Sequence, residues 1–209
     1  MPLPNRTPIM NKKHMTAVFI SALGVLSSFA GGATQNATVT LNGTYFTDPE
    51  FWSVGPGLAQ QQLVDGTYQP EGQQWDFNSV WWNGGTHPED NIVLNLNGAY
   101  DITGFKVQAD DNDTYLLEYM MPGGGSWLPA WQIPAPGGFG LTTSSTTLGS
   151  PIIASELRFT AVDGDNLYAV SQIEAFGTPA GVPDAASTAG LLGSSVAGLA
   201  LLRRRILKF

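Results

Sequence analysis

The sequence predicts an all-β fold, an antiparallel β-sandwich or jelly roll, over residues 34–178. In residues 102–119, two segments of alternating apolar and polar residues flank the turn-forming run 110–113. No amphipathic helix of useful length occurs in residues 34–178, where short alternating segments are separated by turn-forming residues. Repeated strand and turn patterns of this kind are typical of two packed antiparallel sheets.

A secretion signal is predicted ahead of this domain, over residues 1–33. A basic pair at 12–13 precedes the apolar run 15–30, and the small residues Ser28 and Ala30 suit positions beside a cleavage site. We therefore expect an N-terminal signal helix and an exported protein. A helix in the domain core is the alternative, but this run lacks a polar face.

The strands of the domain are predicted in chain order from their alternation. They are expected at 37–41, 92–96, 105–109, 115–119, 127–133, 157–161 and 167–176. In the last of these, Val170 and Ile173 fall on opposite parity, so the strand either carries a bulge or is covered on both faces. Residues 134–151, rich in Gly, Pro, Ser and Thr, are expected to form an exposed loop.

Residues 44–90 lack a clear period and are rich in Gly, Gln and aromatic residues. A loop this long in a compact domain is usually functional, and ligand sites combine apolar rings with a few placed polar groups. Aromatic residues in loops or at strand ends, with two basic donors, are therefore candidates for ligand binding: Trp52, Tyr68, Trp81, Trp82 and Trp131, with Lys106 and Arg158. The alternative for each ring is a place in the core, because Trp is highly buried on average.

The domain is strongly acidic. Of the nine Lys and Arg, only Lys106 and Arg158 lie between residues 34 and 178, whereas all seventeen Asp and Glu except Asp184 lie there. Nucleic acid and anionic membrane surfaces require a positive footprint, so neither is an expected partner of the domain. The chain has no Cys, which excludes disulfides and thiolate metal sites.

Catalysis is not indicated by the sequence. His87 is the only histidine in the domain, and no nucleophile or metal-ligand spacing surrounds it. Among so many carboxylates, some pair will lie at a distance suited to glycoside hydrolysis by chance, and no pair stands out. We expect the protein not to be an enzyme.

The C-terminal region changes character after the domain. Residues 179–188 form a breaker-rich linker, and residues 189–209 combine an apolar run with three arginines. Such a run predicts a hydrophobic helix, and a basic cluster behind it is retained on the cytoplasmic side of the inner membrane.

The tail resembles the C-terminal sorting signals of the PEP-CTERM class, in the variant that begins Val-Pro-Asp. Its motif is Val182, Pro183 and Asp184, followed by the apolar run and by Arg203, Arg204 and Arg205. The commonest form continues Ser-Gly, where this chain has two alanines. The resemblance implies export in a Gram-negative bacterium that makes exopolysaccharide, and processing by an exosortase-type enzyme. An ordinary membrane anchor is the alternative.

The domain resembles the discoidin-like, galactose-binding-like jelly rolls that also occur as carbohydrate-binding modules. The residues that carry the resemblance are 64–66 with Trp75, the hairpin 102–119, residues 157–159 and the closing segment 171–177. In that family, the Asp of Asp-Gly and the Glu of the last strand often share a structural calcium ion. The resemblance thus implies a Ca²⁺ site at Asp65 and Glu174, whose carboxylates are suitable ligands.

Together these patterns predict an exported, surface-sorted binding module that recognises extracellular polysaccharide and is not catalytic. It would be tethered by its C-terminal segment and then reach the cell surface or extracellular matrix. A structural matrix or adhesion protein without a small-molecule site is the alternative, and a small glycoside hydrolase is the third.

Overall fold

The computed structural model describes residues 32–84 and 90–181. The sorting motif and the segments expected to form the signal helix and the hydrophobic tail helix lie outside the described residues, apart from Gly32 and Ala33 of the predicted signal. Within the described ranges, no helix has the length and apolar character needed to cross a membrane.

Within the described ranges, the domain has eight strands and two short helical segments. In chain order they are β1 (Thr38–Asn42), α1 (Thr44–Thr47), β2 (Trp52–Val54), the 3₁₀ helix η1 (Gln60–Val64), β3 (Val80–Asn83), β4 (Asn91–Asp110), β5 (Thr114–Met120), β6 (Leu128–Ile133), β7 (Leu141–Asp163) and β8 (Leu167–Pro179).

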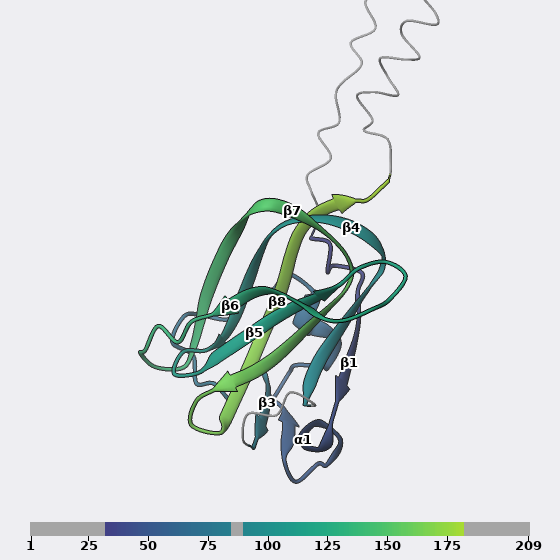
Figure 1. Ribbon diagram of the computed structural model, residues 1–209. Coiled ribbons are helices and arrows are strands. Elements are labelled where there is room, and N and C mark those ends of the chain that lie inside the picture. The colour runs from purple at the N-terminus through teal and green to yellow at the C-terminus, as the bar shows by residue number, and fades with distance from the viewer. Residues whose placement is uncertain (1–31, 85–89, 182–209) are drawn as a thin grey trace, which may run out of the picture.

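The strands form two antiparallel layers (Figure 1). One layer, called here the β8 sheet, contains β2, β3, β8, residues 100–110 of β4 and residues 141–154 of β7. The other, called the β5 sheet, contains β1, residues 91–95 of β4, residues 156–163 of β7, β5 and β6. The predicted antiparallel β-sandwich is confirmed.

Two long strands, β4 and β7, run through both layers and join them. Their pairing changes register between Asn95 and Tyr100, where β4 turns the corner of the sandwich. At this corner Asn97 has a φ of 57°, and its backbone N–H donates to Asn95 Oδ1 at 2.9 Å. Asn tolerates this left-handed backbone better than most residues, which explains how one strand replaces the two predicted at 92–96 and 105–109.

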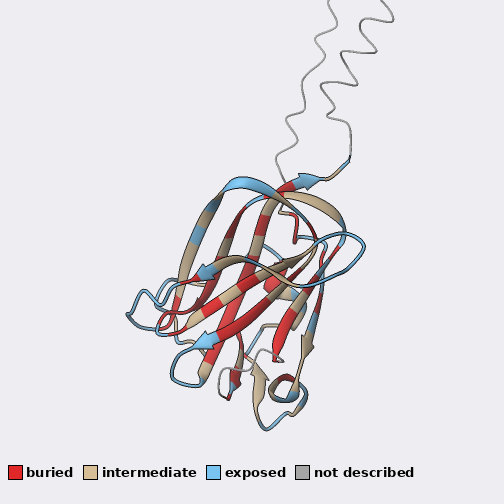
Figure 2. Cartoon of the chain, in the orientation of Figure 1, coloured by how far each residue is buried: buried red, intermediate tan, exposed pale blue. Residues whose placement is uncertain are grey.

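The core lies between the layers, where Figure 2 shows the buried residues gathered. Phe105 and Val107 from the β8 sheet and Leu117 and Phe159 from the β5 sheet are all fully buried. They alternate along each strand with polar residues such as Lys106, Glu118 and Arg158, which is the period-two pattern read from the sequence.

The last strand, β8, has both of the features that the sequence left as alternatives. Gln172 pairs with Gln108 of β4, but Val170 pairs with Ala109, so Ser171 is the extra residue of a bulge. Residues 168–173 are also buried on both faces, because a loop covers the outer side of the β8 sheet.

The expectation of a loop over residues 134–151 is wrong for most of its length. Only residues 134–140 connect β6 to β7, and residues 141–147 pair with β4. Positions 142–147 are all Ser or Thr, because this part of β7 forms the edge of the β8 sheet and needs few apolar residues. Without apolar alternation the strand gave no period-two signal.

Candidate functional site

The outer face of the β8 sheet carries three rows of side chains across β8, β4 and β7. The backbone register places each row, because residues paired across strands on one face are neighbours. From the buried row to the open one, the rows are Gln172, Gln108 and Thr143; Glu174, Lys106 and Ser145; and Phe176, Gly104 and Thr147.

The first row is closed by the segment that follows η1. Gln108 is fully buried, and its Oε1 accepts hydrogen bonds from Gln69 N–H at 2.7 Å and from the Ser171 hydroxyl at 2.8 Å. Its Nε2 donates to Gln69 O at 2.9 Å and to Thr143 Oγ1 at 3.1 Å. The Gln172 amide is oriented so that both of its polar atoms are hydrogen-bonded. Its oxygen accepts from Gly66 N–H at 2.8 Å, and its nitrogen donates to Gln62 O at 3.1 Å. Two buried amides thus fasten this segment to the sheet.

The second row is half covered by Tyr68. The Tyr68 hydroxyl donates to Glu174 Oε2 at 2.8 Å, and Lys106 Nζ lies 3.7 Å from the centre of the Tyr68 ring. Burial, followed by the hydrogen bond and the charge of Glu174, raises the pKa of Tyr68, so the phenol remains a neutral donor. Tyr68, Lys106 and Glu174 therefore form one contact group on the surface.

The third row is open and forms a groove of about 470 Å³. Its lining residues are Thr103, Gly104, Phe105, Lys106, Ser145, Thr146, Thr147 and Phe176. Gly104 is the floor between Phe176 and Thr147. A Cβ at Gly104 would lie 2.7 Å from the carbonyl oxygen of Thr146, so the sheet admits no larger residue there.

The groove offers the chemistry that a polar, ring-shaped ligand needs. Phe176 supplies a half-buried aromatic ring, Lys106 an ammonium donor, and Ser145 and Thr147 hydroxyls that donate and accept. Polar groups at fixed positions around an apolar surface are the usual design of small-molecule sites, whose volumes run from about 300 to 1,000 Å³.

Asp65 lies outside this groove, in a separate polar pocket of about 120 Å³. Residues Gly57, Leu58, Gln62, Thr67, Gln69 and Asn78 line this pocket with it. Asp65 Oδ1 accepts the backbone N–H of Thr67 at 2.7 Å, whereas the carboxylate of Glu174 faces Tyr68. Across residues 32–84 and 90–181, no group of three or more His, Asp or Glu is arranged to hold a metal ion. The calcium pair implied by resemblance stays a prediction.

Trp82 is a core residue, which corrects its place among the ligand-binding candidates. Its side chain is 2% exposed and its ring centre lies 4.7 Å from that of Phe46 and 5.4 Å from that of Tyr168. Trp52 and Trp81 are half-buried on β2 and β3, at the end of β8 opposite Phe176. These three rings therefore do not join Lys106 in one site.

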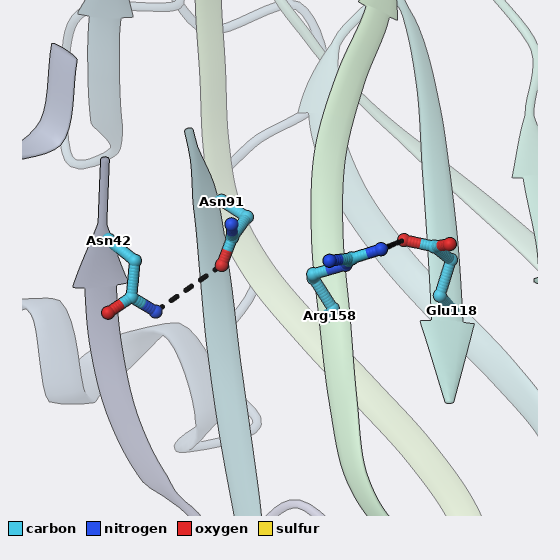
Figure 3. Close-up of polar contacts among 4 residues, drawn as sticks. All are labelled: Asn42, Asn91, Glu118 and Arg158. Carbon is cyan, nitrogen blue, oxygen red and sulfur yellow. Dashed lines mark hydrogen bonds and ion pairs between the residues drawn. The ribbon is translucent and has the colours of Figure 1, made fainter. Parts of the chain in front are cut away.

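Arg158 and Trp131 lie in the other layer, the β5 sheet. Arg158 donates to Glu118 Oε2 through Nε at 2.7 Å, and its guanidinium lies 4.7 Å from the Trp127 ring centre. Figure 3 shows this pair beside the hydrogen bond of 3.3 Å from Asn42 to Asn91, which ties β1 to β4. Trp131 packs against the core. Of the seven ligand-binding candidates, only Lys106 lines the groove, and Tyr68 lies beside it in contact with Lys106.

The residues that sequence reasoning missed are Phe176, Gly104, Ser145 and Thr147. Phe176 was assigned to the last strand, and its outward direction depends on the bulge at Ser171. Ser145 and Thr147 lie in the segment that the sequence predicts to be a loop. The available signal was the run of six Ser and Thr at 142–147, because its four Thr are β-branched and favour a strand.

Buried carboxylates gather at the opposite end of the sandwich from the C-terminal end of β8. Asp113 is fully buried, and it accepts the Tyr115 hydroxyl at 2.9 Å and the Asp165 N–H at 3.3 Å. Burial raises the pKa of Asp113 to about 7 and that of Asp110 to about 6, from an ordinary value of 3.8. Between about pH 4 and about pH 7, Asp110 and Asp113 therefore hold protons in the folded state that they release in the unfolded chain.

The melting temperature is accordingly expected to fall as the pH rises from about 4 to about 7, and to level off above about 8. Across this window, the folded state binds more protons than the unfolded state, so stability decreases with pH. Calorimetry at a series of pH values checks this. The variant Asp113→Asn should flatten the profile, whereas Asp76→Asn, at an exposed position, should not. A profile that rises through this window would contradict the assignment.

Comparisons with known proteins concern the tail and the fold. A family model described as the VPDSG-CTERM motif matches residues 181–206, which confirms the interpretation of the tail as a sorting signal of the PEP-CTERM type. No curated protein matches the chain.

Several solved structures are similar to the domain. The family 32 carbohydrate-binding module of Clostridium perfringens NanJ, in complex with galactose, is 14% identical, with 70% of this chain and 96% of that one covered and a TM-score of 0.44. Chitosan-binding module 1 of a chitosanase/glucanase from Paenibacillus sp. IK-5 is 16% identical, with 70% and 98% covered and a TM-score of 0.45.

A family 89 glycoside hydrolase of C. perfringens is 15% identical, with a TM-score of 0.48. The match covers 73% of this chain and 15% of that enzyme. The chain thus contains an antiparallel β-sandwich domain followed by a VPDSG-CTERM sorting signal.

Proposed function

We propose that the protein is an exported, surface-sorted and non-catalytic module that binds a sugar residue of an extracellular polysaccharide in the groove beside Phe176. The groove carries the proposal, because it places an aromatic ring, a Lys ammonium and two hydroxyls around a floor that Gly104 keeps low.

Neutral sugars suit the groove because their hydroxyls both donate and accept hydrogen bonds. Lys106 can donate to a ring or hydroxyl oxygen, and the neighbouring Glu174 carboxylate, which accepts one bond from Tyr68, retains further acceptor capacity. Phe176 offers an apolar face for the C–H groups of a sugar ring. Tyr68 fixes the direction of both charged groups, so little side-chain entropy is lost on binding.

The same groove argues against hydrolysis of the bound sugar. Glycoside hydrolysis requires a pair of carboxyl groups about 5 to 9.5 Å apart across the scissile bond. Among the described residues that line the groove, none carries a carboxyl or imidazole group, and the row beside the groove adds the single carboxylate of Glu174. A binding role therefore fits these residues better than catalysis.

The proposed activity lies outside the cytoplasm. The VPDSG-CTERM match supports processing by an exosortase-type enzyme, with the inner membrane as a transient tether and the cell surface or matrix of a Gram-negative bacterium as the destination. The acidic domain makes nucleic acid an unsuitable partner. Calcium at Asp65, with Glu174 as the second expected ligand, would serve as a structural aid.

Glycan binding by the full chain tests the proposal. A glycan array followed by calorimetry should show saturable binding that Phe176→Ala weakens about tenfold or more, the loss of about 1.4 kcal/mol or more. Thr147→Trp should abolish binding by filling the groove, because Thr147 is exposed and tolerates a larger side chain. Phe139→Ala is the matched control, since this exposed ring lies in the β6–β7 loop.

Each outcome separates the candidate functions. Binding that survives both groove variants would move the site elsewhere, and the absence of binding to any glycan would favour a structural matrix or adhesion protein. Repeating the titration with EDTA and with added Ca²⁺ isolates the metal. A calcium-dependent rise in melting temperature that Asp65→Asn removes would support the ion, and an unchanged melting temperature would reject it.

A further inference from the structure

The last strand of the domain ends at a corner of the sandwich that β4 and β7 also form. Pro179 pairs with Tyr100 of β4, which pairs on its other side with Ala154 of β7. Directly after the strand, the N–H of Ala180 donates to the carbonyl of Ala99 at 2.8 Å. Figure 1 shows this corner at the top, where β8 ends beside the arch of β7. The chain therefore leaves the domain at this corner.

Two exposed apolar side chains lie at the same corner. Ile153 occupies one row with Asp101 and Thr178, the row just beyond the groove, and it is 49% exposed. β5 ends beside residue 156 of β7, and Met121, which follows β5, is 51% exposed. The corner is called here the terminal end, and it consists of residues 97–101, 119–122, 148–156 and 177–181.

The terminal end carries little charge. Its only charged residues are Asp101 and Glu156, and it has no Lys or Arg. The opposite end of the sandwich also exposes apolar rings, but these lie among carboxylates. There the carboxylate of Asp111 lies against Gly138, the residue next to the exposed ring of Phe139. Contact with an apolar phase therefore requires less desolvation of charge at the terminal end than at the opposite end.

The length of the tail decides which end of the domain can meet a membrane. Seven residues, 182–188, separate Gly181 from the apolar run that begins at residue 189. Fully extended, they span at most about 25 Å. β8 has 13 residues, so the opposite end of the sandwich lies about 40 Å from Gly181. Of the two ends, only the terminal end can reach a bilayer that holds the apolar run.

We propose that the terminal end docks on the bilayer that holds the tail, with Met121 and Ile153 in contact with the lipid interface. This inference rests on the membrane tether that the proposed function assigns to the tail. Apolar side chains gain free energy by leaving water for the interface. Since the tether keeps the domain at a high local concentration beside the lipid, a small apolar area suffices. Without Lys or Arg, the contact does not depend on anionic lipids.

Docking places the sugar-binding groove close to the membrane. Phe176, which lines the groove, precedes Thr178 by two residues on β8, a rise of about 7 Å. A polysaccharide bound in the groove of the tethered protein therefore lies near the lipid surface. This consequence depends on the proposed function, whereas the docking itself does not involve sugar.

Nitroxide labels measure the contact with lipid directly. The chain has no Cys, so Ile153→Cys, Met121→Cys and Phe139→Cys each carry a single label. The full chain is reconstituted into phosphatidylcholine vesicles, and collisions of the label with oxygen, which concentrates in lipid, are compared with collisions with a water-soluble nickel chelate. We expect the oxygen-to-nickel ratio at positions 121 and 153 to exceed that at position 139 several-fold. Equal ratios at the three positions would overturn the proposal.

Matched charge variants test whether the two side chains cause the contact. The label is placed at Thr178→Cys, an exposed position in the row of Ile153. Met121→Asp with Ile153→Asp should lower its ratio to the level of position 139, because carboxylates resist transfer into the interface. Phe77→Asp with Phe139→Asp, at the opposite end, should leave the ratio unchanged. A ratio unaffected by the first pair would contradict the proposal.

Melting temperatures of both double variants should equal that of the unchanged chain, because all four side chains are exposed. Flotation of the vesicles then separates docking from the tether. A chain that floats with the vesicles but keeps water-exposed labels rejects docking alone, and a chain that stays in solution rejects the tether and docking together. Labels shielded from both oxygen and nickel would indicate a second copy at the terminal end and would also overturn the proposal. Glycan binding is measured separately, so its failure is a distinct result.

Discussion

Replacing Trp82 with alanine is expected to lower the free energy of unfolding by about 3–5 kcal/mol. The ring is almost fully buried and contacts Phe46, Tyr168 and Tyr115 at the centre of the aromatic cluster. Truncation loses the transfer free energy of the indole and leaves a cavity among rigid rings that cannot collapse to fill it. Urea unfolding followed by circular dichroism measures the loss.

Phe139→Ala serves as the control for Trp82→Ala, because Phe139 is 65% exposed and its removal should change stability by less than about 0.5 kcal/mol. Sugar binding by the Trp82 variant should persist at temperatures where the variant remains folded. Weakened sugar binding with unchanged stability would instead make Trp82 a ligand-binding ring and contradict its place in the core.

The second large effect is expected for Gln108→Leu, with a loss of about 2–4 kcal/mol. The leucine is similar in size but removes the side-chain partners of Gln69 N–H and Gln69 O. It also removes one of the two acceptors of the Ser171 hydroxyl, which keeps the backbone carbonyl of residue 108. Buried polar groups left without partners cost about 1–3 kcal/mol each, and the covering segment can relieve part of this cost by moving into water. Detachment of that segment would also release Tyr68 from Glu174.

Hydrogen exchange of the amides of Gly66 and Gln69 measures this detachment directly. Both should exchange faster in the Gln108 variant. The N–H of Gln69 donates to Gln108 itself, and the N–H of Gly66 donates to Gln172, the residue paired with Gln108 on β8. The control is Gln132→Leu at an exposed position of β6, which should leave both rates unchanged. Unchanged exchange in the Gln108 variant would show that the buried amide does not fasten the segment.

The parts of the fold that the sequence predicted well are those where one face is buried and the other is not. The hairpin around residues 110–113 and the parity change in β8 both depend on alternation, which burial of one face enforces. The edge portion of β7 was missed because Ser and Thr occupy both faces of it. The corner of β4 was missed because its left-handed residue, Asn97, resembles an ordinary turn former.

The site was harder to predict because it depends on register between strands that are far apart in the sequence. Lys106 and Glu174 were recognised as individual residues, but only the pairing of β4 with β8 makes them neighbours. Phe176, Gly104 and Thr147 come together through the same pairing and through β7. Arg158 carries the same charge as Lys106, yet it lies in the other sheet and is neutralised by Glu118.

Mapping of backbone amide shifts by NMR during titration with an oligosaccharide identified on the array tests the central claim most directly. We predict that the shifts that change cluster at Gly104, Lys106, Thr147 and Phe176, on the outer face of the β8 sheet. Changes confined to the acidic end around Asp111 and Asp163, or to the β5 sheet around Arg158, would contradict the account.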